Sequence, residues 1–272
     1  MQHDESKRVL VRTVERYERD GLGLGNALRT IVIDPSAGWI IRGEAARVLA
    51  ISEDGAAAEY LLQQFFSQEG KDELWETALT LEHLGDVGSV RPLIDAVSDM
   101  NYHRRHAAAR ALGWIRKPGS RAVSALINAL TDASQPLAVR EEAAESLAYL
   151  DSSRAIPPLI SILTDPEVRI RFWAVFALGS IRNHRTLRHA DRRVVSAMEA
   201  MLSDHAVPPG NWWPVAREAL AMLGQLDPPE EGYRDQFVRD IQRVVDDPNS
   251  SQEDRRWAEC YFAAAGSLSV RQ

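Results

Sequence analysis

Hydrophobic residues recur along this chain at helical spacing. Val139, Ala143, Leu147 and Leu150 follow one another at steps of four, four and three residues. This spacing places the four side chains on one face of a helix. We find no stretch that alternates apolar and polar residues as a half-buried strand does. The pattern therefore predicts an all-α protein.

The same two-helix pattern returns several times. The first helix carries an alanine at its centre (Ala108, Ala143 and Ala174), with a leucine four residues later, in segments 105–116, 139–150 and 170–181. A second apolar helix that ends in aspartate is predicted at 89–99, 122–132, 155–165 and 194–204. A repeated two-helix unit is the sequence signature of an α-solenoid, so we expect one elongated array over the 272 residues.

Small and charged residues recur at the unit boundaries. Alanine at the centre of the first helix allows a close crossing with a neighbouring helix, which a larger side chain would overpack. An aspartate at the end of a second helix is followed by an arginine in the next first helix. We interpret these residues as inter-repeat ion pairs and helix caps: Asp34 with Arg42, Asp99 with Arg104, Asp132 with Arg140, Asp165 with Arg169, and Asp247 with Arg255.

The unit resembles the HEAT repeat, in particular the short bacterial subtype called the phycobilisome-lyase HEAT-like repeat. The resemblance covers residues 42–265. The positions that the repeat favours are occupied by Asp165, Val168, Arg169, Ala174, Leu178 and Gly179. The resemblance implies a right-handed α-solenoid, a superhelix of about seven HEAT-like helical pairs. It also implies that the second helices line a concave, protein-binding face.

We expect a single solenoid over residues 1–272. Residues 5–34 and 233–268 depart from the pattern and are interpreted as N-terminal and C-terminal capping units with a more polar outer side. The repeats span 42–232 and carry insertions at 182–193 and 203–214.

Charge and composition restrict the possible partners. The net charge of −7 and the isoelectric point near 5.6 are the opposite of what a nucleic-acid-coating protein usually shows. No apolar run approaches the roughly 20 residues of a membrane span, so a cytoplasmic protein without membrane contact is expected. Cys260 is the single cysteine, which excludes an internal disulfide and a cysteine-built zinc site. We interpret it as a buried apolar residue.

Several HEAT-like proteins are enzymes, and their site residues can be sought here. Deoxyhypusine hydroxylases carry a di-iron site built from His-Glu dipeptides; this chain has none, and Arg105-His106-Ala107 and Arg140-Glu141-Glu142 stand at that phase. His103 and His106 fit a solvated basic turn better than a metal pair. The acidic balance argues against an alkylpurine DNA glycosylase, although the chain is rich in tryptophan. A bilin lyase subunit stays open on resemblance alone. No catalytic residue, metal ligand or cofactor is expected.

Two groups of residues are candidates for partner binding. In the second helices, Asp95, Asn128 and Ser161 share one register and would form a small, weakly charged groove floor; equally, they are the solvated side of amphipathic helices. The insertions supply the second group, because loops vary without disturbing a solenoid core. These residues are Arg182, Arg185, Arg188, Arg192, Arg193, Trp212 and Trp213.

Each insertion also has a simpler interpretation. The arginines can clamp carboxylates or phosphates of a partner, or they can form a solvated loop. The tryptophans can anchor a partner, or they can pack within an oversized unit. We therefore predict a non-enzymatic scaffold that binds a protein or peptide through its concave face and the 182–214 edge. An enzyme or enzyme subunit is the alternative, and the sequence leaves the oligomeric state open.

Overall fold

The computed structural model is helical throughout the residues that it describes. These are residues 2–21, 23–50, 55–115, 118–181, 191–210, 213–223, 233–252, 254–256 and 258–259, and no strand occurs among them. The contacts divide the chain into two compact units, Met1–Ser146 and Leu147–Gln272, which we call unit 1 and unit 2. The all-α prediction and the solenoid architecture are confirmed; a single array over the whole chain stays a prediction.

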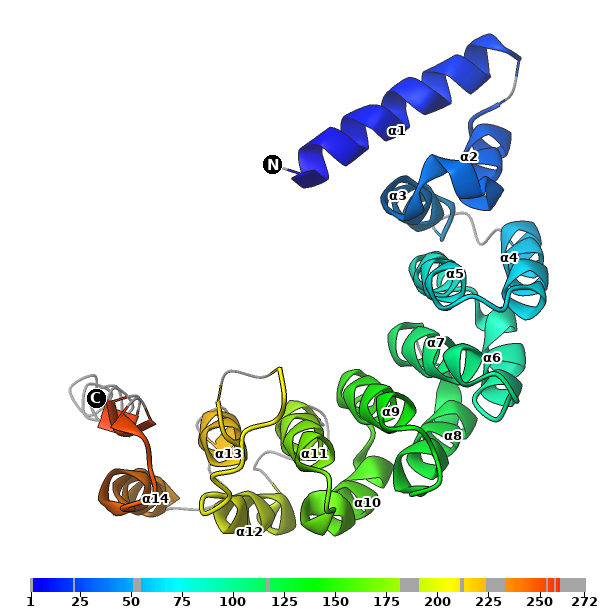
Figure 1. Ribbon diagram of the computed structural model, residues 1–272. Helices are drawn as coiled ribbons and strands as arrows, with labels where there is room; N and C mark the ends of the chain where they lie inside the picture. Colours follow the sequence, from blue (N-terminus) through cyan, green and yellow to red (C-terminus); the bar gives the residue numbers. More distant parts are fainter. Residues whose placement is uncertain are drawn as a thin grey trace. The chain divides into compact units, whose positions relative to one another are not determined.

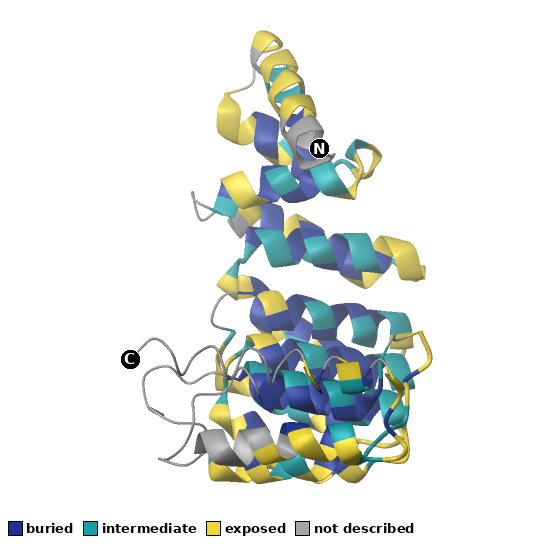
Figure 2. Ribbon diagram, turned by 90° about the vertical axis from the view of Figure 1, so that its left-hand side faces the viewer, coloured by how far each residue is buried: buried dark blue, intermediate teal, exposed yellow. Residues whose placement is uncertain are grey.

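Unit 1 consists of helix pairs that stack in two rows (Figure 1). One row holds α3 (Trp39–Leu49), α5 (Lys71–Leu84), α7 (Tyr102–Trp114) and the first part of α9 (Leu137–Tyr149). The other row holds α2 (Leu24–Ile33), α4 (Gly55–Ser67), α6 (Val90–Ala96) and α8 (Gly119–Thr131). Helix α1 (Gln2–Arg19) packs on α2 and α3 and carries exposed residues along much of its length (Figure 2).

The two rows of unit 1 differ in how tightly they pack. Neighbours in the α3, α5 and α7 row lie in extensive contact, whereas neighbours in the α2, α4, α6 and α8 row touch much less. The tightly packed row therefore lies on the inner side of the unit's curve and the loosely packed row on the outer side (Figure 1). We call them the inner row and the outer row.

Small residues make the tight packing of the inner row possible. Ala108 and Ala143 are fully buried, as the repeat pattern predicts. Gly113 of α7 lies against Ser146 of α9 so closely that a Cβ atom on the glycine would overlap the Cα, Cβ and Oγ atoms of the serine. The Ser146 hydroxyl donates a 2.9 Å hydrogen bond to the Ala109 carbonyl, which satisfies a polar group buried at this crossing.

Buried arginines join three of the inner helices of unit 1, α3, α7 and α9, to the ends of outer helices. The Nε atoms of Arg42, Arg104 and Arg140 donate to the carbonyls of Val32, Phe65 and Leu130, at 2.9, 3.3 and 2.9 Å. These carbonyls lie in the last turns of α2, α4 and α8, where intrahelical donors are missing. The arginines therefore act as C-terminal caps from the neighbouring helix.

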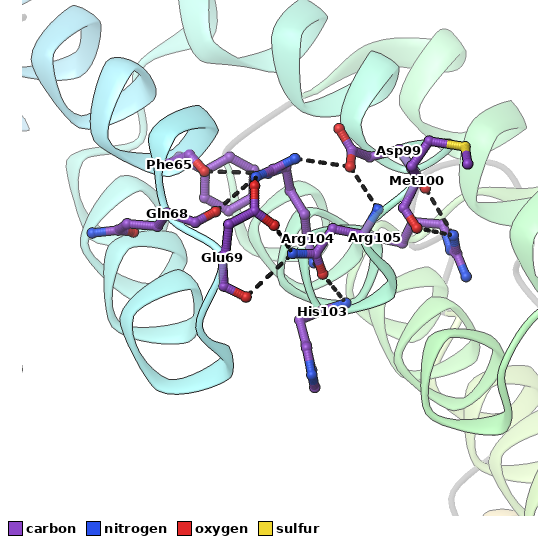
Figure 3. Close-up of polar contacts among 9 residues, drawn as sticks. Phe65, Gln68, Glu69, Asp99, Met100, His103, Arg104 and Arg105 are labelled. Atoms are coloured by element: carbon purple, nitrogen blue, oxygen red, sulfur yellow. Dashed lines mark hydrogen bonds and ion pairs between the residues drawn. The ribbon is translucent and has the colours of Figure 1, made fainter.

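Arg104 makes several further contacts, and Figure 3 shows them between α4 and α7. Its guanidinium donates to the Gln68 carbonyl at 2.6 Å and forms ion pairs with Asp99 at 2.8 Å and Glu69 at 3.1 Å. The predicted pair of Asp99 with Arg104 is thus confirmed. Asp34 and Asp132 accept hydrogen bonds from Ser36 and Ser134 in the following turns. These bonds lower the pKa of both aspartates, and the charges of Arg42 and Arg140 lower it further.

Unit 2 repeats the arrangement with other side chains. Its helices are α10 (Ile156–Ser161), α11 (Val168–Ser180), α12 (Arg192–Met201), α13 (Val215–Leu223) and α14 (Tyr233–Asp246), with short 3-10 turns at Ser153–Ala155 and Ile162–Thr164. Helices α11 and α13 pack side by side, and a Cβ atom on Gly179 would overlap the side chain of Met222. Arg171 pairs with Asp204 at 2.7 Å and donates to the Asp165 carbonyl at 2.8 Å.

One tryptophan of the insertion at 203–214 is bound to helix α13. The Trp213 indole Nε1 donates to Glu218 Oε2 at 2.8 Å, and the Arg217 guanidinium lies 5.3 Å from the centre of the Trp213 ring. Glu218 is buried in α13. Burial raises the pKa of Glu218, while the hydrogen bond from Trp213 and the charge of Arg217 lower it. Contacts within unit 2 therefore explain the position of the Trp213 side chain.

Replacing Gly113 with alanine tests the close crossing of α7 and α9. We expect Gly113→Ala to lower the free energy of unfolding by about 1–3 kcal/mol, because the new methyl group has no space beside Ser146. Gly25→Ala is the matched control, since Gly25 lies in α2 with nothing near its missing Cβ. The control should be neutral or slightly stabilising. Urea unfolding measures both; equal stability of the two variants would contradict the crossing.

Glu218 predicts a pH dependence of stability. A carboxyl whose pKa is raised in the folded state contributes stability below its unfolded pKa, and that contribution is lost as the pH rises through the raised value. Glu218→Gln keeps an acceptor for Trp213 and has no charge to bury. We expect the variant to melt higher than the wild type at about pH 7, and this difference to disappear near pH 4, below the ordinary pKa of glutamate.

The exposed Glu59→Gln should show no such pH dependence in the same thermal scans. A Glu218→Gln variant whose advantage grows toward acid would contradict the burial of an ionised carboxylate.

Candidate functional site

A stripe of large polar and aromatic side chains runs along the exposed side of α7. His103, His106, Arg110 and Trp114 follow at steps of three, four and four residues, and all are at least partly exposed. The residues between them, from Ala107 to Ala109 and from Ala111 to Gly113, are buried. Because α7 is flanked by α5 and α9 and backed by the outer row, this stripe faces the inner side of unit 1. We call the exposed side of α5, α7 and the first part of α9 the inner face.

Arg110 lies at the centre of the inner face, between carboxylates from both neighbouring helices. Its Nε atom lies 3.3 Å from Glu82 of α5. Its Nη1 atom lies 3.8 Å from Glu142 and 3.6 Å from Glu145, both in α9. We call the three glutamates the carboxylate cluster. Arg110 thus joins three helices, although none of its contacts is as short as the 2.7–2.9 Å typical of charge-assisted hydrogen bonds.

Two tryptophans and a histidine surround the same arginine. The guanidinium carbon of Arg110 lies 4.5 Å from the centre of the Trp114 ring and 5.8 Å from that of Trp75. The His106 ring stacks on Trp75 with the centres 4.9 Å apart, and its Nε2 atom lies 3.3 Å from Glu142 Oε2. Cation-π contact and ring stacking therefore fix the guanidinium of Arg110 and the ring of His106 against the two tryptophans.

One member of the carboxylate cluster is buried with an oxygen that has no hydrogen-bond donor among the described residues. Arg110 and Arg47 both act on Glu82, and Arg110 also faces the two glutamates of α9. Burial raises the pKa of Glu82, and Arg110 opposes that shift. Glu142 is only 6% exposed, yet its Oε1 atom accepts no hydrogen bond from the described residues. A buried oxygen in this state costs free energy until a donor reaches it.

His83 borders the inner face in a neutral form. Its Nε2 atom lies 2.6 Å from Arg47 Nη2, and its Nδ1 atom contacts the Leu79 carbonyl. A guanidinium can only donate, so Nε2 is the acceptor and Nδ1 carries the proton. Burial lowers the pKa of His83, which agrees with this assignment. His83 is therefore a fixed hydrogen-bonding group and adds no positive charge.

The residues predicted to form the groove floor lie elsewhere. Asp95 and Asn128 are exposed on α6 and α8, in the outer row of unit 1, and Ser161 is exposed on α10, where its hydroxyl donates to the Pro158 carbonyl. The expectation that second helices line the inner side is wrong for unit 1. The alanine-rich first helices approach each other more closely, and so they form the inner row. Partner binding by Asp95, Asn128 and Ser161 stays a prediction.

The predicted insertion residues are only partly within the described structure. Arg182, Arg185, Arg188 and Trp212 lie outside the described residues. Arg192 and Arg193 begin α12, where Arg193 binds both carboxylate oxygens of Asp191, with the closest contact at 2.7 Å. Trp213 is engaged with Glu218. Binding of a partner at this edge stays a prediction.

The inner face itself was missed by sequence reasoning. The signal was the stripe of His103, His106, Arg110 and Trp114 on one helix, whose two histidines fitted a solvated basic turn in the sequence.

Membrane-spanning helices and metal-binding clusters are both absent from the described residues. Within the described ranges, no helix is long and apolar enough to cross a membrane. No group of three or more histidine, cysteine, aspartate or glutamate residues that could hold a metal ion occurs there either.

Comparison with curated proteins finds an enzyme among the relatives. The deoxyhypusine hydroxylases of Rattus norvegicus and Mus musculus are 28% identical to this chain over 159 residues, which are 58% of this chain and 51% of each relative. The chain thus spans about half the length of the curated relatives it matches.

Two solved structures share the fold. The complex of CpcE and CpcF of phycocyanin lyase from Nostoc sp. PCC7120 matches with 25% identity and a TM-score of 0.51, covering 62% of this chain and 99% of that one. An archaeal HEAT-like repeats protein from Thermococcus onnurineus NA1 matches with 17% identity and a TM-score of 0.53, covering 90% and 97%.

The family assignment rests on the repeats themselves. The family of HEAT repeats matches residues 58–138 and 123–206, which together span more than half of the chain. These residues include all of α5, α7, α9 and α11, so the inner face lies within the matched repeats. The chain belongs to the HEAT-repeat family.

Proposed function

We propose that this chain is a non-enzymatic HEAT-repeat scaffold that holds a protein or peptide partner on the inner face of unit 1. The observation that carries the proposal is the inner face itself, where Trp114 is 38% exposed beside Arg110 and the carboxylate cluster. Tryptophan and arginine are enriched among the residues that dominate binding energy in protein interfaces. Their occurrence together on one open helix face supports a protein partner.

The extent and the charge of the inner face support the same conclusion. It runs across three neighbouring helices, whose axes in packed pairs lie about 8–10 Å apart. A surface of that width suits a helix or an extended peptide. The three carboxylates on this face disfavour a polyanion, and with it a nucleic-acid partner and a glycosylase-type activity. A cytoplasmic location and a contribution from the 182–214 edge, both expected from the sequence, stay predictions.

A di-iron centre of the kind that deoxyhypusine hydroxylases carry does not fit these residues. His106 and Glu142 lie next to each other at the corresponding phase, but the cation between the carboxylates is the guanidinium of Arg110. A metal ion there would meet a positive charge and too few ligands, since iron sites need several nitrogen or oxygen donors together. We therefore derive no metal-dependent step for this chain.

An enzyme-subunit role is the second candidate, and one observation favours it. The match to phycocyanin lyase covers nearly the whole of that chain, and that structure is a complex of two proteins. A subunit of this type would use its surface to bind a second chain, as a scaffold does. A purified complex of this chain with its partner that shows lyase activity, lost when this chain is removed, would favour the subunit role over the scaffold.

Site-specific photo-crosslinking tests the placement of the partner. We expect benzoylphenylalanine at position 114, on the inner face, to crosslink the co-purified partner. The same residue at position 60 should not, because Tyr60 is about equally exposed but lies on α4 in the outer row. Both substitutions replace one exposed aromatic side chain with another, so the comparison isolates the face. Crosslinking from position 60 with none from position 114 would contradict the proposed function.

A further inference from the structure

We infer that the inner face recognises a basic side chain, lysine or arginine, of the partner, and that this group binds Glu142 and Glu145 in place of Arg110 Nη1. The inference rests on the proposed function, because it assumes that a protein partner occupies this face. It specifies the chemical group that the partner presents and the two glutamates that bind this group. Neither glutamate was singled out by the sequence as a partner-binding residue.

The first support is the incomplete bonding of Glu142. The side chain is almost fully buried, and its Oε1 atom accepts no hydrogen bond from the described residues. Its other oxygen faces His106 at 3.3 Å. A lysine or arginine N–H group would supply the missing donor and bring a compensating charge. A neutral donor would supply the hydrogen bond without the compensating charge, and an acidic group would add repulsion.

The second support is the weak hold of Glu142 and Glu145 on Arg110. The Nη1 atom lies 3.8 and 3.6 Å from these two glutamates, whereas Arg171 and Asp204 in unit 2 meet at 2.7 Å. Arg110 also keeps a separate contact with Glu82 at 3.3 Å and its position over the Trp114 ring. Arg110 can therefore release the α9 carboxylates and remain bound to Glu82 and Trp114.

The third support is an approach from solvent to these carboxylates. The side chains of Glu145, His106 and Arg110 are 22, 20 and 18% exposed, and Trp114 presents part of its ring beside them. An incoming cation would first meet the exposed carboxylate of Glu145 and the aromatic ring, and then the buried carboxylate of Glu142. The incoming cation would then complete the hydrogen bonding of Glu142 and place a positive charge beside Glu145.

Simple peptides of opposite charge test the inference with the full-length chain. The probe is a fluorescein-labelled (Lys-Ala-Ala)4 peptide, and (Glu-Ala-Ala)4 is its acidic counterpart. Fluorescence anisotropy should show binding of the lysine peptide and none of the glutamate peptide. We expect Glu142→Gln plus Glu145→Gln to weaken lysine-peptide binding by about tenfold.

The control is Glu15→Gln plus Glu59→Gln, which removes the same charge from exposed positions on helices α1 and α4. It should change the affinity less than about twofold, because exposed charges away from the site are screened by salt. Equal losses in both double variants would show attraction by overall charge and overturn the inference. Absence of lysine-peptide binding to the wild type would also overturn it.

Arg110→Gln should increase the affinity for the lysine peptide, whereas a folding defect would decrease it. Without its resident cation, the carboxylate cluster should bind the lysine peptide more tightly than the wild type does. Weaker binding, in a variant whose circular dichroism is unchanged, would contradict displacement of Arg110.

The two proposals fail separately. Partner crosslinking at position 114 together with lysine-peptide binding that is insensitive to Glu142 and Glu145 would retain the inner face and reject the basic ligand. Loss of crosslinking at position 114 would reject the proposed function itself.

Discussion

Close packing of neighbouring inner helices is the constraint on which unit 1 depends. Gly113 and Ser146 meet with no space for another methyl group, and fully buried alanines occupy the centres of α7 and α9. Helices this close have no room for long side chains at their crossings, so the long side chains lie on the solvent side of the row or reach the ends of the outer helices. The stripe from His103 to Trp114 and its partners on α5 and α9 therefore form a continuous face, because the side chains at the helix crossings are so small.

The arginines of unit 1 fall into two groups with different roles. Arg42, Arg104 and Arg140 bind backbone carbonyls at the ends of the outer helices, so each charge has close, well-directed partners. Arg110 has longer contacts with three carboxylates, one of which keeps an oxygen without a hydrogen bond. The first group holds neighbouring pairs of helices together. The charged groups around Arg110 lack part of their hydrogen bonding, which is characteristic of ligand-binding surfaces.

The helices, the buried alanines and the Asp99 and Arg104 pair could be predicted from the sequence, because each depends on residues close together in the chain. The side that forms the inner row could not, since periodicity identifies a buried face but not the curvature of the stack. The carboxylate cluster was also beyond reach, because Glu82, Arg110 and Glu142 meet only when three helices are stacked in register. Trp213 was visible as a candidate, and its bond to buried Glu218 explains it without a partner.

Hydrogen-deuterium exchange of the chain alone and bound to its co-purified partner would locate the binding surface most directly. Backbone amides exchange more slowly where a partner limits local opening. Protection is expected in the inner helices of unit 1, across residues 71–84, 102–114 and 137–146, with little change in α4, α6 and α8. Protection confined to the outer helices, with exchange of the inner helices unchanged, would contradict an inner binding face.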